Sequence, residues 1–135
     1  MLKILLAYDG SDEAKRGLEW VTRFAGDVSV TVIGVAPTLG GSEPIADSVD
    51  PNFDVGVHHR RLQEAAETLG EAGLAVEVVE TAGNPAEAIV ETAESGQFDL
   101  IVVGTRGRHA VQRFLFGSTA DRVARHAPCP VLLVR

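Results

Sequence analysis

Four residues between Val102 and Thr119 have the types and the spacing needed to hold a phosphate group: Gly104, Gly107, Gly117 and Ser118. Glycine lets the backbone approach a ligand closely, because it has no Cβ atom and adopts positive φ angles easily. A serine at the start of a helix can cap it, and the free N–H groups of the first turn attract an anion. The stretch therefore predicts a phosphate-binding cradle between a strand and a helix.

A plainer interpretation applies to each of these positions taken alone. Gly104 and Gly107 could shape an ordinary strand-to-helix turn, and Gly117-Ser118 could be an ordinary helix cap. We favour the cradle because the apolar run from Leu100 to Val103 precedes all four positions and a helical pattern follows them.

The positive charge of the chain gathers on and after this glycine stretch. The whole chain carries a net charge of −7, which argues against nucleic acid as a general partner. Residues 1–100 carry six Lys and Arg against 18 Asp and Glu, a net −12, whereas residues 101–135 carry six Arg against one Asp, a net +5. Arg122 and Arg125 suit the C-terminus of a helix. Arg106 and Arg108 remain as candidates for contact with an anionic ligand.

The rest of the chain alternates apolar runs with helical patterns. The runs predict five strands, at Lys3 to Tyr8, Val28 to Ala36, Leu74 to Glu80, Leu100 to Val103 and Val131 to Val134. Glu77 in the third run suggests a strand at the edge of the sheet. Strands that alternate with helices imply a parallel sheet covered on both faces, and five strands suit a doubly wound sheet. We expect a single α/β domain spanning residues 1–135.

Local signals predict where the helices begin and which side chains they bury. Ser11 can cap the first helix, which Gly26 ends, and Asn84-Pro85 starts the third, which runs to about Ser95-Gly96. Ser118 and Asp121 resemble a capping box at the fourth. The spacing predicts the inward-facing residues Ala14, Leu18, Val21, Ala25, Leu62, Ala65, Ala66, Leu69, Ala120, Val123, Ala124 and Ala127. In the second helix it predicts Arg60, Arg61, Glu64 and Glu67 to face outward.

Several remaining features argue against other kinds of site. The stretch from Pro37 to Asn52 is rich in Pro, Gly, Ser and Asp, and we favour a disordered insertion there over a lid. His58 and His59 are neighbours on different helix faces, so we expect no metal pair. The single cysteine, Cys129, excludes an internal disulfide and favours a quiet, half-buried thiol. No apolar run approaches the roughly 20 residues that span a bilayer, and we expect a cytoplasmic protein with no membrane partner.

Three known classes of phosphate-handling protein are excluded by their motifs. The chain has no G-x-x-x-x-G-K-[ST] sequence, and Lys3 and Lys15 are its only lysines, so it is no P-loop enzyme. No G-x-G-x-x-G follows the first strand, which excludes a dinucleotide fingerprint. A response-regulator domain would need clustered acids after the first strand and a lysine after the fifth, whereas Asp9 has only Asp12 as an acidic companion.

Over nearly its whole length the chain resembles the universal stress protein family. The glycine stretch matches the family's ATP-binding signature, G-x2-G-x9-G-S, at every defined position. Three further segments resemble the family: Ile4 to Ser11 its opening, Gly83-Asn84-Pro85 with Ile89-Val90 its third helix, and His126 to Val134 its ending. The resemblance implies the strand order 3-2-1-4-5, which places Asp9 across from the cradle.

The resemblance also implies a site for an adenine nucleotide, with ATP as the ligand and Mg²⁺ or Mn²⁺ carried on its phosphates. It places Asp9 at the adenine or the ribose, the backbone of Val35 at the adenine, and Gly104 under the ribose. It assigns the phosphates to Gly107, Gly117, Ser118 and Thr119, and the candidate set is completed by Ala7, Val103, Arg106 and Arg108. Ala7 and Ala120 depart from members that have Pro and a hydroxyl residue there. Asp9 could instead only accept N–H bonds from the Gly10-Ser11 turn.

The residue pattern predicts a nucleotide-binding site, and the resemblance to the family implies an ATP-binding regulatory switch in a stress response. His109 is the only nearby candidate base, so we assign no catalytic residue and expect at most slow ATP hydrolysis. The alternatives are a nucleotide-free interaction module of the same fold and a true ATPase or phosphotransferase. The apolar last strand, Val131, Leu132, Leu133 and Val134, lies at a sheet edge in the implied order, which predicts a homodimer through that strand.

Overall fold

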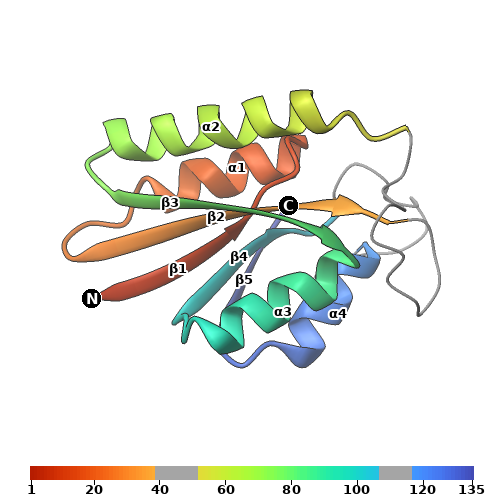
Figure 1. Ribbon diagram of the computed structural model, residues 1–135. Helices are drawn as coiled ribbons and strands as arrows, with labels where there is room; N and C mark the ends of the chain where they lie inside the picture. The colour runs from red at the N-terminus through yellow and green to blue at the C-terminus, as the bar shows by residue number, and fades with distance from the viewer. Residues whose placement is uncertain (39–51, 107–116) are drawn as a thin grey trace.

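Five parallel strands form one sheet in the order β3-β2-β1-β4-β5, in a computed structural model that describes residues 1–38, 52–106 and 117–135 (Figure 1). The predicted α/β fold and strand order are therefore confirmed. In chain order the elements are β1 (Leu2–Ala7), α1 (Asp12–Val21), β2 (Val28–Pro37), α2 (Val55–Glu71), β3 (Ala75–Gly83), α3 (Pro85–Ser95), β4 (Leu100–Gly104), α4 (Ser118–His126) and β5 (Val131–Val134). Most of the predicted stretch from Pro37 to Asn52 lies outside the described residues.

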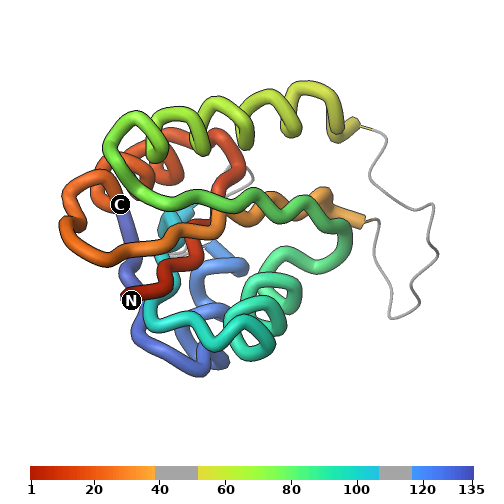
Figure 2. The backbone as a smooth tube through the Cα atoms, turned by 60° about the vertical axis from the view of Figure 1, so that its left-hand side comes forward, coloured from red at the N-terminus to blue at the C-terminus, as the bar shows by residue number. Residues whose placement is uncertain are grey.

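The central strand, β1, fills the core on both faces of the sheet. Its residues Ile4, Leu5 and Leu6 are fully buried, because α1 and α2 cover one face and α3 and α4 cover the other (Figures 1 and 2). Successive side chains of a strand point to opposite faces. Ile4 and Leu6 accordingly pack with Leu62 and the α1 side, while Leu5 packs with Val123 and the α3 side. A continuous apolar run is thus the sequence of a strand buried on both faces.

Side-chain caps fix the starts of three helices. The Ser11 hydroxyl accepts a hydrogen bond from the Ala14 N–H at 3.1 Å, and the Asn84 side chain accepts one from Glu87 at 3.1 Å, as the sequence predicts. Asp54 caps α2 in the same way. These caps satisfy N–H groups that the first turn of a helix leaves without partners, and each is worth about 1 kcal/mol.

The predicted capping box at Ser118 is wrong. Gly117 occupies the cap position of α4 in an extended conformation, with no side-chain cap, and Ser118 is the first helical residue. The Asp121 N–H donates to the Gly117 carbonyl at 3.0 Å, and the Asp121 carboxylate pairs with Arg125 at 3.1 Å. Within the described part of the chain, α4 therefore starts without a side-chain cap.

Three predicted side-chain orientations are also wrong. The first helix ends at Val21, so Ala25 is exposed in the turn that Gly26 closes with a φ of +93°. Ala124 is exposed, whereas its neighbour Val123 is fully buried. Arg61 was expected to face outward, but it is half-buried. The first error arises because the helix ends earlier than expected, and the other two because periodicity alone does not fix how a helix is rotated against the sheet.

The two edges of the sheet are β3 and β5. Glu77 is exposed on β3, which confirms the edge position that its charge suggests. On β5, Val134 is buried, whereas the three residues before it are half-buried. The Ile101 N–H donates to Pro130 and the Thr105 N–H donates to Val134, so β5 turns the carbonyls of its even-numbered residues toward β4. In a parallel ladder the amides of Val131 and Leu133 then point away from β4.

Candidate functional site

The carboxyl ends of β1 and β4 meet at one edge of the sheet. Leu6 of β1 pairs with Val102 of β4, so the residues that follow each of them continue side by side toward that edge. From β1 the chain proceeds outward to β2 and β3, and from β4 it proceeds the other way to β5. Ligands of doubly wound sheets bind beyond the strand ends where the order reverses in this manner. The predicted residues Asp9 and Gly104 both lie at this point.

The turn after β1 is built by Asp9, Gly10 and Ser11. The Asp9 carboxylate accepts a hydrogen bond from the Ser11 N–H at 2.9 Å, and Gly10 has a φ of +78°. The alternative role of Asp9, to hold the Gly10-Ser11 turn, is therefore real. The turn leads directly to Ser11, the buried residue that caps α1. Contact between Asp9 and a ligand stays a prediction.

Gly104 is required by the packing of α1 on β4. A Cβ atom at this position would stand 2.7 Å from the Cβ of Glu13 and 3.4 Å from the N atom of Ala14. Such contacts are too close for any other residue without a movement of the helix. One glycine of the signature is thus explained by helix packing, whether or not a ligand lies above it.

Gly117 brings the start of α4 against the end of β4. Its N–H donates to the Thr105 carbonyl, and a Cβ atom here would stand 2.7 Å from the carbonyl oxygen of Arg106. The first turn of α4 is thereby fixed beside the segment that leaves β4. The N–H groups of that turn, from Ser118 and Thr119 onward, have no acceptor within the helix. They form the anion-attracting end that the sequence predicts.

The other predicted residues fall at the same edge, or outside the described part of the chain. Ala7 ends β1, Val103 lies next to the end of β4, and Val35 lies two residues before the end of β2. Arg106 is exposed, two residues after the end of β4 at Gly104. The structure therefore brings nine of the eleven candidates together: Ala7, Asp9, Val35, Val103, Gly104, Arg106, Gly117, Ser118 and Thr119. Gly107 and Arg108, like His109, lie outside the described residues.

Arg61 of α2 adds a cation that the sequence did not assign to this edge. Its Cδ atom lies 2.7 Å, and its Nε atom 3.2 Å, from the place where a Cβ atom of Gly10 would stand. The side chain can lie so close because position 10 is a glycine. Within the described ranges Arg61 has no ion pair. The sequence contained one clue to this position: Arg61 directly precedes Leu62, which is fully buried, so Arg61 lies at the border of the inward face of α2.

Tyr8 is a buried phenol directly before Asp9. Burial raises the pKa of Tyr8 above its ordinary value of 10.0, and the carboxylates of Glu64 and Asp9 raise it further. Its backbone N–H donates to the Ile33 carbonyl at 3.0 Å. Tyr8 is therefore neutral over the physiological pH range and is buried directly before the Asp9 turn.

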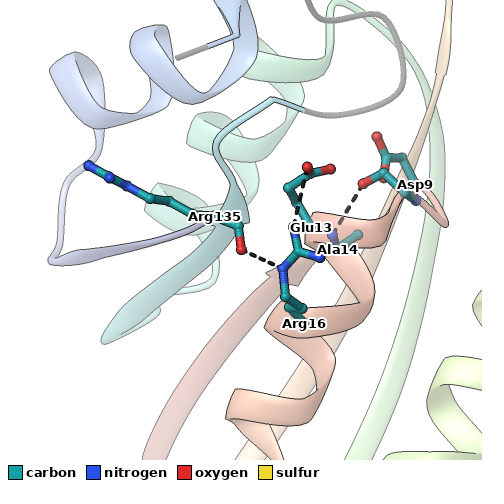
Figure 3. A network of polar contacts seen from close by, with 6 residues as sticks. Asp9, Glu13, Ala14, Arg16 and Arg135 are labelled. Carbon is teal, nitrogen blue, oxygen red and sulfur yellow. Dashed lines mark hydrogen bonds and ion pairs between the residues drawn. The ribbon is translucent and has the colours of Figure 1, made fainter. Parts of the chain in front are cut away.

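A polar network joins the start of α1 to the end of β5. Arg16 donates from Nε to the carbonyl of Arg135, and its Nη2 atom lies 3.3 Å from the Glu13 carboxylate (Figure 3). Glu13 is the residue whose Cβ atom touches Gly104. The network thus reaches the candidate site through Glu13. Sequence reasoning missed it, because its members lie on separate elements.

Neither a metal cluster nor a membrane helix is found among the described residues. No group of three or more His, Cys, Asp or Glu side chains within 1–38, 52–106 and 117–135 is arranged to hold a metal ion. His58 is buried on α2 while its neighbour His59 is exposed, which confirms their placement on different faces. In the same ranges no helix is long and apolar enough to cross a membrane.

A separate groove lies between α3 and α4, with a volume of about 240 Å³. Its lining residues are Ala86, Glu87, Val90, Glu91, Arg122 and His126. An ion pair between Arg122 and Glu87 at 3.3 Å lies along it. None of these lining residues belongs to the predicted candidate set, so the groove is distinct from the site at the strand ends.

Comparison with known proteins gives consistent results. The model of the universal stress protein family matches residues 1–135. A Thermus aquaticus protein, named as a universal stress protein in the QAH/OAS sulfhydrylase 3′ region, is 40% identical over 137 residues, covering 98% of this chain and 97% of the relative.

Solved structures share the fold. The hypothetical protein MJ0577 has a TM-score of 0.83 and 26% identity, with 98% of this chain and 94% of the other covered. A universal stress protein solved in complex with cAMP has a TM-score of 0.73 and 25% identity, with 99% and 96% covered.

Proposed function

This chain belongs to the universal stress protein family, and from that premise we propose that it binds an adenine nucleotide, foremost ATP, as a regulatory switch in a stress response. The observation that carries the proposal is the meeting of the Asp9 turn, Gly104 and the first turn of α4 at one edge of the sheet. A related universal stress protein has been solved with cAMP, which supports an adenine nucleotide as the ligand class.

Each part of the site has a separate task in this proposal. The N–H groups at Gly107, Gly117, Ser118 and Thr119 hold the phosphates, because the start of a helix attracts anions. The ribose and adenine lie along Ala7, Asp9, Val35, Val103 and Gly104. Arg106 and Arg108 provide positive charge at the phosphates, and Arg61 adds to it from the side of α2.

A divalent ion would arrive with the nucleotide. The described residues offer no cluster of metal ligands, and Mg²⁺ is commonly held by substrate phosphates together with few protein groups. Mg²⁺ or Mn²⁺ on the phosphates would then offset their charge. In this proposal the described residues contribute backbone donors and arginines rather than a cage of carboxylates.

We propose binding rather than catalysis as the main activity. Phosphoryl transfer needs a residue that positions or deprotonates the nucleophile. The only histidine of the glycine stretch is His109, and no carboxylate of that stretch accompanies it. Turnover well below about one per second, the slow end of kinases, is expected.

We also propose that the chain forms a homodimer through β5. The residues Val131, Leu132 and Leu133 are half-buried on an edge strand, where the amides of Val131 and Leu133 face outward. Proteins commonly blunt such edges with charges, Pro or a covering element. Pairing of β5 with its two-fold copy would cover this edge.

Binding is tested on gently purified protein by mass spectrometry under native conditions. A co-purified adenine nucleotide is the expected result, followed by saturable binding of labelled ATP, with AMP and cAMP as competitors. No binding at millimolar ATP would contradict the proposal and favour a nucleotide-free interaction module. Fast steady turnover would favour an enzyme.

A further inference from the structure

We infer that Arg16 is a positioning residue of the proposed nucleotide site, where it neutralises Glu13 and holds it beside the phosphate cradle. The inference rests on the proposed nucleotide binding. Arg16 contacts Glu13 and the Arg135 carbonyl, and we do not place it in contact with the ligand. Its effect is exerted on Glu13.

Glu13 brings a negative charge to the candidate site. It lies in the first turn of α1, two residues after Ser11, and its Cβ atom contacts Gly104 at the end of β4. Its side chain is only 17% exposed, so solvent screens the carboxylate poorly. The carboxylate suits the N-terminus of α1, since acidic residues stabilise that end of a helix. The same charge repels a phosphate chain bound between Gly104 and α4.

Arg16 offsets that charge from a fixed position. Its Nη2 atom lies 3.3 Å from a carboxylate oxygen of Glu13, one helical turn earlier. Its Nε atom donates to the carbonyl of Arg135, which follows β5 (Figure 3). Val134 of that strand pairs with Gly104 of β4. The planar guanidinium fork serves both acceptors at once, which an ammonium group on a flexible stem does less well. Arg16 therefore offsets the charge of Glu13 and holds its carboxylate in place.

Loss of the guanidinium should weaken binding in proportion to the charge of the ligand. Without Arg16 the negative charge of Glu13 is no longer offset by a nearby cation. At an effective dielectric constant near 20, such a charge about 10 Å away lowers affinity by roughly tenfold for each unit charge of the ligand, and salt screening reduces this effect. Adenosine has no phosphate and should be nearly unaffected.

The test measures ATP and adenosine affinities of Arg16→Gln, with Lys15→Gln as the matched control. Lys15 is exposed on the same helix, and its change removes the same unit of charge. Arg16→Gln is expected to lose about three- to tenfold in ATP affinity and less than about twofold in adenosine affinity. Lys15→Gln should leave both within about twofold. A double variant, Glu13→Gln with Arg16→Gln, should recover ATP affinity, because it removes the charge that Arg16 neutralises.

The outcomes separate this inference from the proposed function. Equal losses for ATP and adenosine, or no recovery in the double variant, would show that Arg16 only supports the fold and would overturn the inference. Unchanged ATP binding in Arg16→Gln would also overturn it. If the parent protein binds neither ligand, the proposed function fails, and the inference fails with it.

Discussion

The side chain of Arg61 on α2 lies against Gly10 in the turn after β1, with its Cδ atom 2.7 Å from the place of a Gly10 Cβ atom. This contact brings a guanidinium to the turn that carries Asp9. An arginine at this edge can compensate the charge of Asp9 and attract phosphates. Glycine suits position 10 because its φ of +78° is strained for other residues, and a side chain there would also displace Arg61.

Arg61→Gln should therefore weaken ATP binding by about three- to tenfold, the range of one solvent-screened charge. Arg60→Gln is the control, because Arg60 is an exposed neighbour with the same charge. Arg61→Met keeps the apolar stem that packs on Gly10 but removes the charge. If Arg61→Met binds ATP as tightly as the parent in calorimetric titration, the contribution is packing alone and the prediction is wrong.

Gly104→Ala should destabilise the fold even without nucleotide. The added Cβ atom would stand 2.7 Å from the Cβ of Glu13, so α1 must move away from β4. Overpacking of this kind costs about 1–3 kcal/mol of unfolding free energy, measurable by urea denaturation. Gly70→Ala is the control, since nothing lies within 4 Å of a Cβ atom at this helical position. A Gly104→Ala protein as stable as the parent would contradict the packing account.

Cys129 should react slowly with disulfide reagents in the native protein. Burial raises the pKa of the Cys129 thiol, and the Asp99 carboxylate raises it further, while a backbone hydrogen bond at Ile101 acts in the opposite direction. A raised pKa leaves less thiolate at a given pH, and the thiolate is the reactive form. Labelling at slightly alkaline pH should be faster in urea, and faster in native Asp99→Asn than in the parent. Equal rates for the parent in urea and in buffer would refute this expectation.

Stability should decline at alkaline pH because of Tyr8. Burial and the nearby carboxylates Glu64 and Asp9 raise its native pKa above 10.0, so the unfolded chain releases the phenolic proton first. The unfolding free energy then falls as pH rises from about 10 toward the native pKa. Tyr8→Phe should flatten this part of the stability curve in urea denaturation at several pH values. Tyr8 is the chain's only tyrosine, so parallel curves for the two proteins would show that its ionisation is not the cause.

The sequence predicted the features that local physics decides. Continuous apolar runs identified the buried strands, and Ser11 and Asn84 identified two helix starts, because a cap bonds within three residues of itself. Nine of the candidate site residues lie at the predicted edge, since parallel strands carry their carboxyl ends to one side.

The features that depend on distant contacts were not predictable. Arg16 and the Arg135 carbonyl are 119 positions apart, and no spacing rule connects them. Arg61 turned out half-buried because α2 crosses the Gly10 turn, which helical periodicity does not encode. Ser118 failed as a cap because the close approach to Arg106 places Gly117 there instead.

The β5 edge provides the basis for the last prediction. The Ile101 N–H donates to Pro130, and the Thr105 N–H donates to Val134, so the ladder to β4 uses the even-numbered residues of β5. The N–H of Leu133 then faces the open edge, whereas the N–H of Leu132 faces β4. A proline at position 133 removes a donor that only a partner strand would use. A proline at 132 would break the ladder within the chain.

Leu133→Pro should therefore convert the proposed homodimer into a monomer, with the sheet of each copy retained. Leu133→Ala is the matched control, because it removes the same side chain from the core but keeps the outward N–H. Light scattering at micromolar concentration should give a dimer for the parent and for Leu133→Ala, and a monomer for Leu133→Pro. Circular dichroism checks that the proline variant remains folded. If the parent is already monomeric, or if Leu133→Pro remains dimeric, the β5 edge is not the interface.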